Sequence, residues 1–231
     1  ADIEPPKRIF AHGWWTNEGK KISKSLGNVI DPNEIIKEYG LDTFRFFLLR
    51  EVPFGNDGDF SKKSLQRRIN NDLANDLGNL VQRVLTIINK NLDGKLNKIK
   101  QIKENDKKLY EYPKEILKNI EKNYEKQEFH KVIESIWKLI SEANKYVDEN
   151  APWQLLKDDK ERAGDVLNIL VLIIAKIAIL LAPIIPNISE NILNKIGLSI
   201  KKLSMKDISS DNFLNMSYKI KKPEIIFQKI E

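Results

Sequence analysis

A regular pattern of apolar and polar positions runs from Ser61 to about Asn91. Apolar side chains recur there every three or four residues, at Leu65, Ile69, Leu73, Leu77, Leu80, Val84 and Ile88. This spacing places them along one side of an α-helix. The pattern therefore predicts one long helix with a single buried stripe.

Helical periodicity returns in four later stretches, at residues 113–126, 129–149, 160–182 and 184–196. Ala151-Pro152 interrupts it, because proline lacks the backbone N–H that a helix interior uses. Residues 92–106, with Gly94 and many lysines, are predicted to form a loop. We expect a mainly α fold built on an up-and-down helical bundle. From Gly197 the pattern decays into a tail, whose segment 223–227 is expected to lie extended across the body.

One stretch, residues 166–186, is almost wholly apolar and nearly long enough to cross a bilayer. Lys176 lies in its middle, where a charge costs roughly 2.5 to 3.5 kcal/mol on membrane-insertion scales. Pro183 and Pro186 close the run as they would close a helix of a soluble protein. We therefore predict that this run forms the central buried helix of the bundle and that the protein has no membrane partner.

The amino-terminal region has a different pattern. Residues 8–12 form a short β-prone run that ends at Gly13, and a polar stretch with glycines follows over residues 16–27. This predicts a strand followed by a mobile loop. Asp31-Pro32 and Gly40 are typical of the beginning and end of a short helix, and a second helix is expected over residues 43–52.

Composition narrows the class of protein. With 41% apolar and 31% charged residues, the chain is expected to be a soluble globular protein. Its net charge of +6 is compatible with a polyanionic partner, although mixed charges such as those of residues 114–126 usually form a solvated face. It has no cysteine and only His12 and His130, so we expect no disulfide and no metal site. Residues 1–6 lack the features of a signal peptide and an initial methionine, which suggests a cytoplasmic location and a cut from a longer chain.

A loop over residues 21–25 presents two lysines and two serines between Gly19 and Gly27. Such a loop suits a triphosphate, because ammonium groups stabilise the charge that grows on a departing pyrophosphate. Taken alone, a loop rich in serine and lysine is more often a solvated loop.

Asn75, Asn79 and Arg83 are four residues apart, which places them on one helical face, away from the apolar stripe. Amide and guanidinium groups suit the reading of base edges, although spacing alone fits an ordinary polar face. Trp153 follows the break at Ala151-Pro152, where an indole can stack on an unpaired base. In isolation a core tryptophan is the simpler interpretation.

The region from His12 to Pro32 resembles the Lys-Met-Ser-Lys-Ser signature of class I aminoacyl-tRNA synthetases, with Ile22 in place of methionine. The resemblance implies that ATP phosphates contact Lys21, Ser23, Lys24 and Ser25. It gives Lys24, together with Lys21, the catalytic role at the pyrophosphate. It also places His12 in the same pocket, although a lone histidine at a strand end fits a structural role equally well.

A second resemblance is specific to methionyl-tRNA synthetases. Their anticodon-binding helices carry an Asn-x-x-x-Asn-x-x-x-Arg pattern and an Ala-Pro-Trp element that recognise CAU; the matching residues are Asn75, Asn79, Arg83, Pro152 and Trp153. Residues 54–60, 181–183 and 223–231 also resemble the family. This implies a catalytic-domain remnant of α/β type with a stem-contact region over residues 1–60, an anticodon-binding bundle over 61–197 and a tail over 198–231 that folds back on the body.

The resemblance implies a parent enzyme that activates methionine with ATP and Mg²⁺ and attaches it to tRNA(Met). The nucleotide fold and methionine pocket of the family's first half are absent, so we expect the isolated chain not to make methionyl adenylate. No appended oligonucleotide-binding domain follows residue 231, which favours a monomer. Two alternatives stay open, namely a stand-alone tRNA-binding module and the same half of a synthetase for leucine, isoleucine, valine or cysteine.

Overall fold

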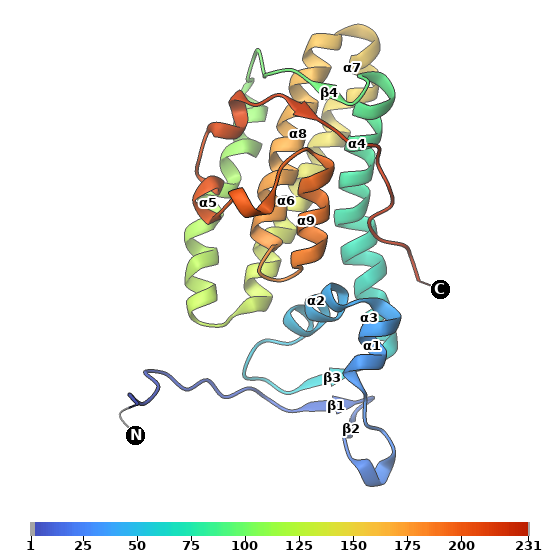
Figure 1. Ribbon diagram of the computed structural model, residues 1–231, viewed down its shortest axis with the longest axis vertical. Helices are drawn as coiled ribbons and strands as arrows, with labels where there is room; N and C mark the ends of the chain where they lie inside the picture. The colour runs from blue at the N-terminus through green and yellow to red at the C-terminus, as the bar shows by residue number, and fades with distance from the viewer. Residues whose placement is uncertain (1–2, 231) are drawn as a thin grey trace.

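The computed structural model describes residues 3–230. Ala1 and Asp2, at the start of the expected remnant, and Glu231, at the end of the expected tail, lie outside the described residues. A helical bundle forms most of the molecule, and a smaller α/β part lies at one end of it (Figure 1). The prediction of a mainly α fold is confirmed.

Short strands and two helices make up the α/β part. Its sheet has the order β2-β1-β3, in which β1 (Trp15–Asn17) pairs antiparallel with β2 (Lys20–Lys21) and parallel with β3 (Gly58–Phe60). Helix α1 (Pro32–Tyr39) begins as predicted, because the Asp31 side chain accepts from the backbone N–H of Asn33. Helix α2 (Leu41–Glu51) follows Gly40 directly.

The predicted strand over residues 8–12 is wrong. Those residues form an exposed extended segment, and the strand begins beyond Gly13, at Trp15. The reason is the sheet partner: β3 pairs with residues 15–17, and nothing within residues 3–230 pairs with 8–12. Gly13 allows the chain to enter the sheet, since a Cβ at this position would lie 2.0 Å from the carbonyl oxygen of Asn56.

The long helix predicted over residues 61–91 is present, but its middle is wider than an α-helix. It consists of α3 (Lys62–Arg68), the π-helical segment η2 (Ile69–Gly78) and α4 (Asn79–Asn91). All the apolar positions of the predicted stripe are at most 4% exposed. The stripe is therefore confirmed, and the π-helical turns are a feature that the apolar spacing did not predict.

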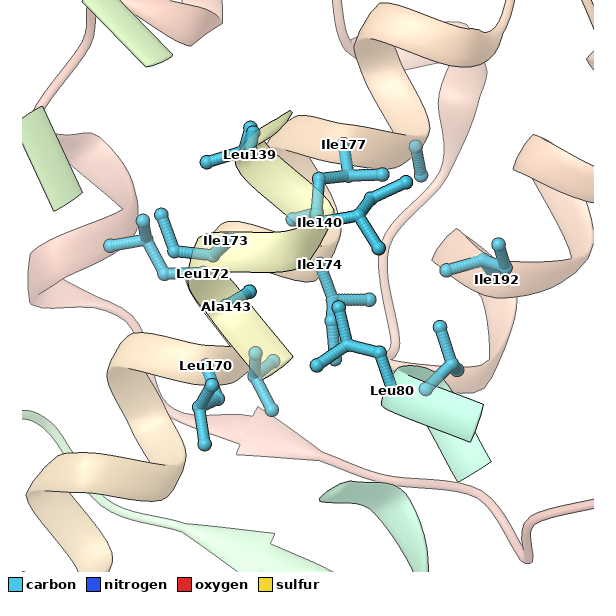
Figure 2. Close-up of a cluster of buried hydrophobic side chains, with 14 of the residues drawn as sticks. Leu80, Leu139, Ile140, Ala143, Leu170, Leu172, Ile173, Ile174, Ile177 and Ile192 are labelled. Carbon is cyan, nitrogen blue, oxygen red and sulfur yellow. The ribbon is translucent and has the colours of Figure 1, made fainter. Parts of the chain in front are cut away.

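The bundle is completed by α5 (Glu104–Glu125), α6 (Phe129–Asn150), α7 (Pro152–Asp158), α8 (Lys160–Leu181) and α9 (Pro186–Lys195). Helix α8 lies at the centre, where Leu170, Ile174 and Ile177 pack among side chains of α4, α6 and α9 (Figure 2). Its length and hydropathy would suit a membrane span, but 94% of its most apolar window is buried inside the protein. This agrees with the predicted central helix.

The predictions for the bundle need correction at several points. The break predicted between residues 149 and 160 contains α7, because Pro152 suits the first helical position. Helix α5 begins at Glu104 and contains Pro113 in its interior, because Asp106 caps the first turn by accepting from the backbone N–H of Lys103. Helix α9 begins at Pro186 after a turn, since proline suits the first helical position. The predicted loop over residues 92–106 contains β4 (Lys95–Leu96), which pairs with β5 (Tyr218–Lys219) of the tail.

The tail crosses the bundle through three short helical turns, η3 (Ile200–Lys202), η4 (Met205–Ile208) and η5 (Asn212–Asn215), before β5. It then runs down beside α4 (Figure 1). Near its end the Asn70 side chain forms two hydrogen bonds of 2.8 Å with the backbone of Ile230. Phe227 packs on Gly78, where a Cβ would lie 3.1 Å from its ring. Phe227 and Ile230 therefore lie against η2.

Candidate functional site

The loop with two lysines and two serines follows a tight hairpin. Glu18 and Gly19 have positive φ angles of 50° and 74°, which turn the chain from β1 into β2. Asp59 fixes this turn by accepting from the Thr16 hydroxyl and from the backbone N–H of Gly19, and these bonds lower the pKa of its carboxyl. After β2 the chain forms the short turn η1 (Lys24–Leu26), which ends at Gly27 with φ of 63°.

Asn28 holds the base of this loop together. Its side-chain oxygen accepts from the backbone N–H of Ser23 at 2.9 Å, and its amide nitrogen donates to the carbonyl of Lys21 at 3.0 Å. Its own carbonyl accepts from the Asn17 side chain at 2.8 Å. No pattern in the sequence distinguishes Asn28 as a positioning residue, since its amide acts on backbone groups that only folding brings near. The predicted mobility of the loop stays a prediction.

The polar groups of the loop are accessible. Lys21, Lys24 and Ser25 are exposed, and the hydroxyls of Ser23 and Ser25 lie 2.7 Å apart. Within residues 3–230 neither lysine forms a salt bridge. The loop thus presents two ammonium groups and two hydroxyls that are suited to phosphate oxygens.

His12 is not joined to this loop. It lies in the exposed segment before β1, and its Nδ1 is 2.8 Å from the carbonyl oxygen of Gly13. No hydrogen bond within residues 3–230 links its ring to residues 21–25.

A second group of predicted site residues meets where α4 and α7 pack together. The guanidinium carbon of Arg83 lies 5.7 Å from the centroid of the Trp153 ring, within the range of a cation–π contact. Trp153 is 45% exposed, so it is not a core tryptophan. The indole and the guanidinium therefore share one solvent-facing spot.

The remaining residues of this group lie on η2, α4 and α7. Asn75 and Asn79 are exposed at η2 and at the start of α4, whereas their neighbours Leu77 and Leu80 are buried. No hydrogen bond among residues 3–230 involves either asparagine side chain, so both amides are available to a ligand. Pro152 is buried at the first position of α7 and fixes the direction of the helix that carries Trp153.

Asp148 is a further member that the sequence pattern does not reveal. Its carboxylate accepts from the guanidinium of Arg83 at 2.6 Å. It comes from α6, which precedes the break at Ala151, so the contact depends on how α4 and α6 pack. Arg83 is thus held between a carboxylate and an indole face.

Comparison with known proteins gives consistent matches along the whole chain. Residues 1–85 match the family described as tRNA synthetases class I (M), and residues 97–231 match the anticodon binding domain of methionyl tRNA ligase. The chain is 45% identical to a methionine–tRNA ligase of Rickettsia felis, covering 100% of this chain and 46% of that protein. It is 42% identical to the Fusobacterium nucleatum enzyme, covering 100% of this chain and 37% of that one.

The fold is similar to solved structures as well. A Mycobacterium tuberculosis methionyl-tRNA synthetase in complex with methionyl-adenylate superposes with a TM-score of 0.90 at 35% identity, covering 97% of this chain and 45% of that chain. The chain spans less than half the length of these relatives. Because the methionyl anticodon-binding family matches more than half of the sequence, and a class I synthetase family matches the part before it, the chain belongs to the methionyl-tRNA ligase family of class I tRNA synthetases.

Proposed function

We propose that this chain reads the CAU anticodon of tRNA(Met) with Asn75, Asn79, Arg83, Pro152 and Trp153. The observation that carries the proposal is the pairing of an exposed indole with the guanidinium of Arg83 at 5.7 Å. An exposed tryptophan beside a cation is a platform on which an unpaired base stacks. The two asparagines supply donors and acceptors for base edges along the same helix.

For the loop we propose contacts with the phosphates of ATP through Lys21, Ser23, Lys24 and Ser25. When the methionine carboxylate attacks the α-phosphorus, charge grows on the departing pyrophosphate, and Lys24, together with Lys21, stabilises it. We assign His12 to the same pocket in the full-length enzyme, as the family resemblance implies. Mg²⁺ would accompany ATP on its phosphate oxygens; residues 3–230 contain no group of three side chains suited to hold a metal.

The parent protein would therefore activate methionine with ATP and esterify it to tRNA(Met) in the cytoplasm, as a monomer. In this proposal residues 1–60 form the end of the catalytic domain, 61–197 read the anticodon and 198–231 brace the bundle. The isolated chain is not expected to make methionyl adenylate. A stand-alone tRNA-binding module is the second candidate, but the match of residues 1–85 to a synthetase family and the free lysines of the loop favour the ligase. Membership of the methionyl family sets aside a synthetase for leucine, isoleucine, valine or cysteine.

The anticodon proposal is tested by titrating the chain with a CAU stem-loop and with a stem-loop altered at one anticodon base. Trp153→Ala should weaken CAU binding by about 1 to 3 kcal/mol, the usual worth of stacking on one base. Trp14→Ala is a matched control, because Trp14 is 79% exposed and lies outside the site. Equal binding of the two stem-loops by the unmodified chain would refute the proposal.

The loop proposal needs the full-length enzyme. Lys24→Ala should slow ATP–pyrophosphate exchange roughly 100- to 1000-fold, the usual cost of removing one transition-state donor. ATP binding should change much less, and Lys37→Ala, an exposed lysine on α1, should leave both unchanged. A loss confined to ATP binding would contradict the transition-state role, and no loss at all would show that Lys24 does not act on the phosphates.

A further inference from the structure

A buried cluster of polar side chains lies where α6 ends and α8 begins. The guanidinium of Arg162 forms two hydrogen bonds of 2.6 Å with the two oxygens of the Asp106 carboxylate. The hydroxyl of Tyr146 donates to the same carboxylate at 2.6 Å, and the backbone N–H of Lys103 donates at 2.8 Å. Asp106 is 0%, Tyr146 4% and Arg162 8% exposed. We call Asp106, Tyr146 and Arg162 the corner cluster.

The hydrogen bonds of the corner cluster keep the carboxyl group of Asp106 ionised. Burial would raise the pKa of Asp106, but the hydrogen bonds from Arg162, Tyr146 and Lys103 outweigh it and lower that pKa. The carboxylate therefore stays ionised and paired with the guanidinium. A bidentate pair of this kind constrains both distance and angle between the elements that carry it.

The corner cluster joins α5, α6 and α8, and the last two of these flank α7 in the chain. Tyr146 lies in the last turns of α6, Arg162 in the first turn of α8 and Asp106 in the first turn of α5. Asn150, the last residue of α6, donates from its side chain to the carbonyl of Tyr146, and the Asp159 side chain caps α8 at the backbone N–H of Arg162. Both ends of the segment 151–159, which contains α7, are thus fixed to one buried carboxylate. Figure 1 shows α7 at the end of the bundle where α6 and α8 meet.

The backbone at this corner is held in a costly conformation. Ala151 has φ of 40° and ψ of 62°, in the left-handed region that a residue with a Cβ rarely adopts. Such a conformation persists only where the surrounding contacts determine it. Trp153 follows two residues later, so a change at the corner would move its indole relative to Arg83.

We propose that the corner cluster positions Trp153 beside Arg83 and thereby sets the specificity of the anticodon-reading surface. This rests on the function proposed above. The cluster touches neither base nor phosphate, so its members are positioning residues. They act by fixing the direction in which α7 leaves α6.

Two tyrosines allow a matched test in the full 231-residue chain. Tyr146→Phe removes one buried hydroxyl hydrogen bond from the corner cluster, and Tyr218→Phe removes one elsewhere, since the Tyr218 hydroxyl donates to the carbonyl of Phe213 at 3.2 Å. Both side chains are 4% exposed. Arg162→Lys keeps the charge but loses the bidentate geometry.

The expected result is a loss of discrimination between the CAU stem-loop and a stem-loop altered at one base. Tyr146→Phe should reduce the ratio of the two dissociation constants roughly 2- to 10-fold, the range of one hydrogen bond, and Arg162→Lys should reduce it further. Tyr218→Phe should leave the ratio unchanged. In a Trp153→Ala background Tyr146→Phe should have no further effect, because the cluster acts through the indole. The same loss in both backgrounds would overturn the proposal.

A second readout does not depend on tRNA. With 5-fluorotryptophan in place of the four tryptophans, the fluorine resonance of Trp153 should shift or broaden in Tyr146→Phe and stay unchanged in Tyr218→Phe. Trp153→Phe assigns that resonance. An unchanged Trp153 signal in both Tyr146→Phe and Arg162→Lys would refute the positioning role. If CAU and altered stem-loops bind the unmodified chain alike, the proposed function fails, while the fluorine signal still decides the positioning claim.

Discussion

Replacing Lys176 by methionine is expected to stabilise the protein. Lys176 is 0% exposed in the middle of α8, and its ammonium nitrogen has no hydrogen-bond partner within residues 3–230. The centroid of the Tyr110 ring is 6.0 Å from the nitrogen, and the charges that act on the ammonium are those of Lys114 and Asp211, which form an ion pair with each other. Burial, reinforced by the charge of Lys114 and opposed by Asp211, lowers the pKa of Lys176 to about 8.

The pKa shift gives the size of the effect. A fall from 10.5 to about 8 corresponds to a penalty of about 3 kcal/mol for holding the charged form in the folded protein, at 1.36 kcal/mol per pKa unit. Methionine has a similar unbranched stem and no charge, so Lys176→Met should raise the free energy of unfolding by up to about 3 kcal/mol at pH 7. Replacement of buried ionic groups by apolar ones of similar volume is often stabilising by amounts of this order.

The sign of the pH dependence follows from proton linkage. Below pH 8 both the folded and the unfolded chain carry the proton, and the full penalty is present. Between pH 8 and 10.5 the unfolded chain binds more protons than the folded chain, so the lysine's contribution to stability rises with pH. The advantage of Lys176→Met should therefore shrink by about 1 kcal/mol between pH 7 and pH 9.

Urea unfolding followed by circular dichroism at pH 7 and pH 9 measures both quantities. Leu172→Met, at another fully buried position of α8, controls for the packing of methionine and should show no such pH dependence. Burial also raises the pKa of Tyr124 to about 12, but this term is common to all variants and cancels in the differences. If Lys176→Met were no more stable than the unmodified chain at pH 7, or its advantage were the same at pH 9, the ammonium would not be desolvated as inferred.

Three further substitutions give distinct outcomes. Ala151→Gly should raise the free energy of unfolding by about 1 kcal/mol, because glycine adopts the left-handed conformation without strain. Calorimetry should show a melting temperature about 2 to 4 °C higher. A lower melting temperature would contradict the inferred strain. Asn70→Ala removes both hydrogen bonds to Ile230 and should cost about 1 to 2 kcal/mol locally, seen as faster amide exchange at the end of the tail and not in α8. Asn28→Ala should slow ATP–pyrophosphate exchange in the full-length enzyme about 10- to 100-fold, because the loop is misplaced. Its melting temperature should be unchanged. A normal exchange rate would show that Asn28 does not position the loop.

Much of the fold follows from local sequence. The buried stripe of the long helix, the apolar run of α8 and the Asp31-Pro32 start of α1 depend on periodicity and capping, which act between residues close in the chain. The family could also be recognised from the sequence. Each of its motifs is short, so the residues within one motif lie close together in the chain.

Contacts between distant segments decided the rest. The strand lies at Trp15 and not at residues 8–12 because β3 pairs with it there, and α5 extends before Pro113 because Asp106 caps it and is itself held by Arg162. The carboxylate of Asp148 reaches Arg83, and the indole of Trp153 faces that guanidinium, only through the packing of α4 against α6 and α7. By itself the sequence determined which polar residues each helix carries and which side of the helix is apolar. Helical periodicity depends only on residues that are close in the chain. Which polar side chains meet was determined only by tertiary structure, because their partners lie dozens of residues away and no local pattern encodes their distance.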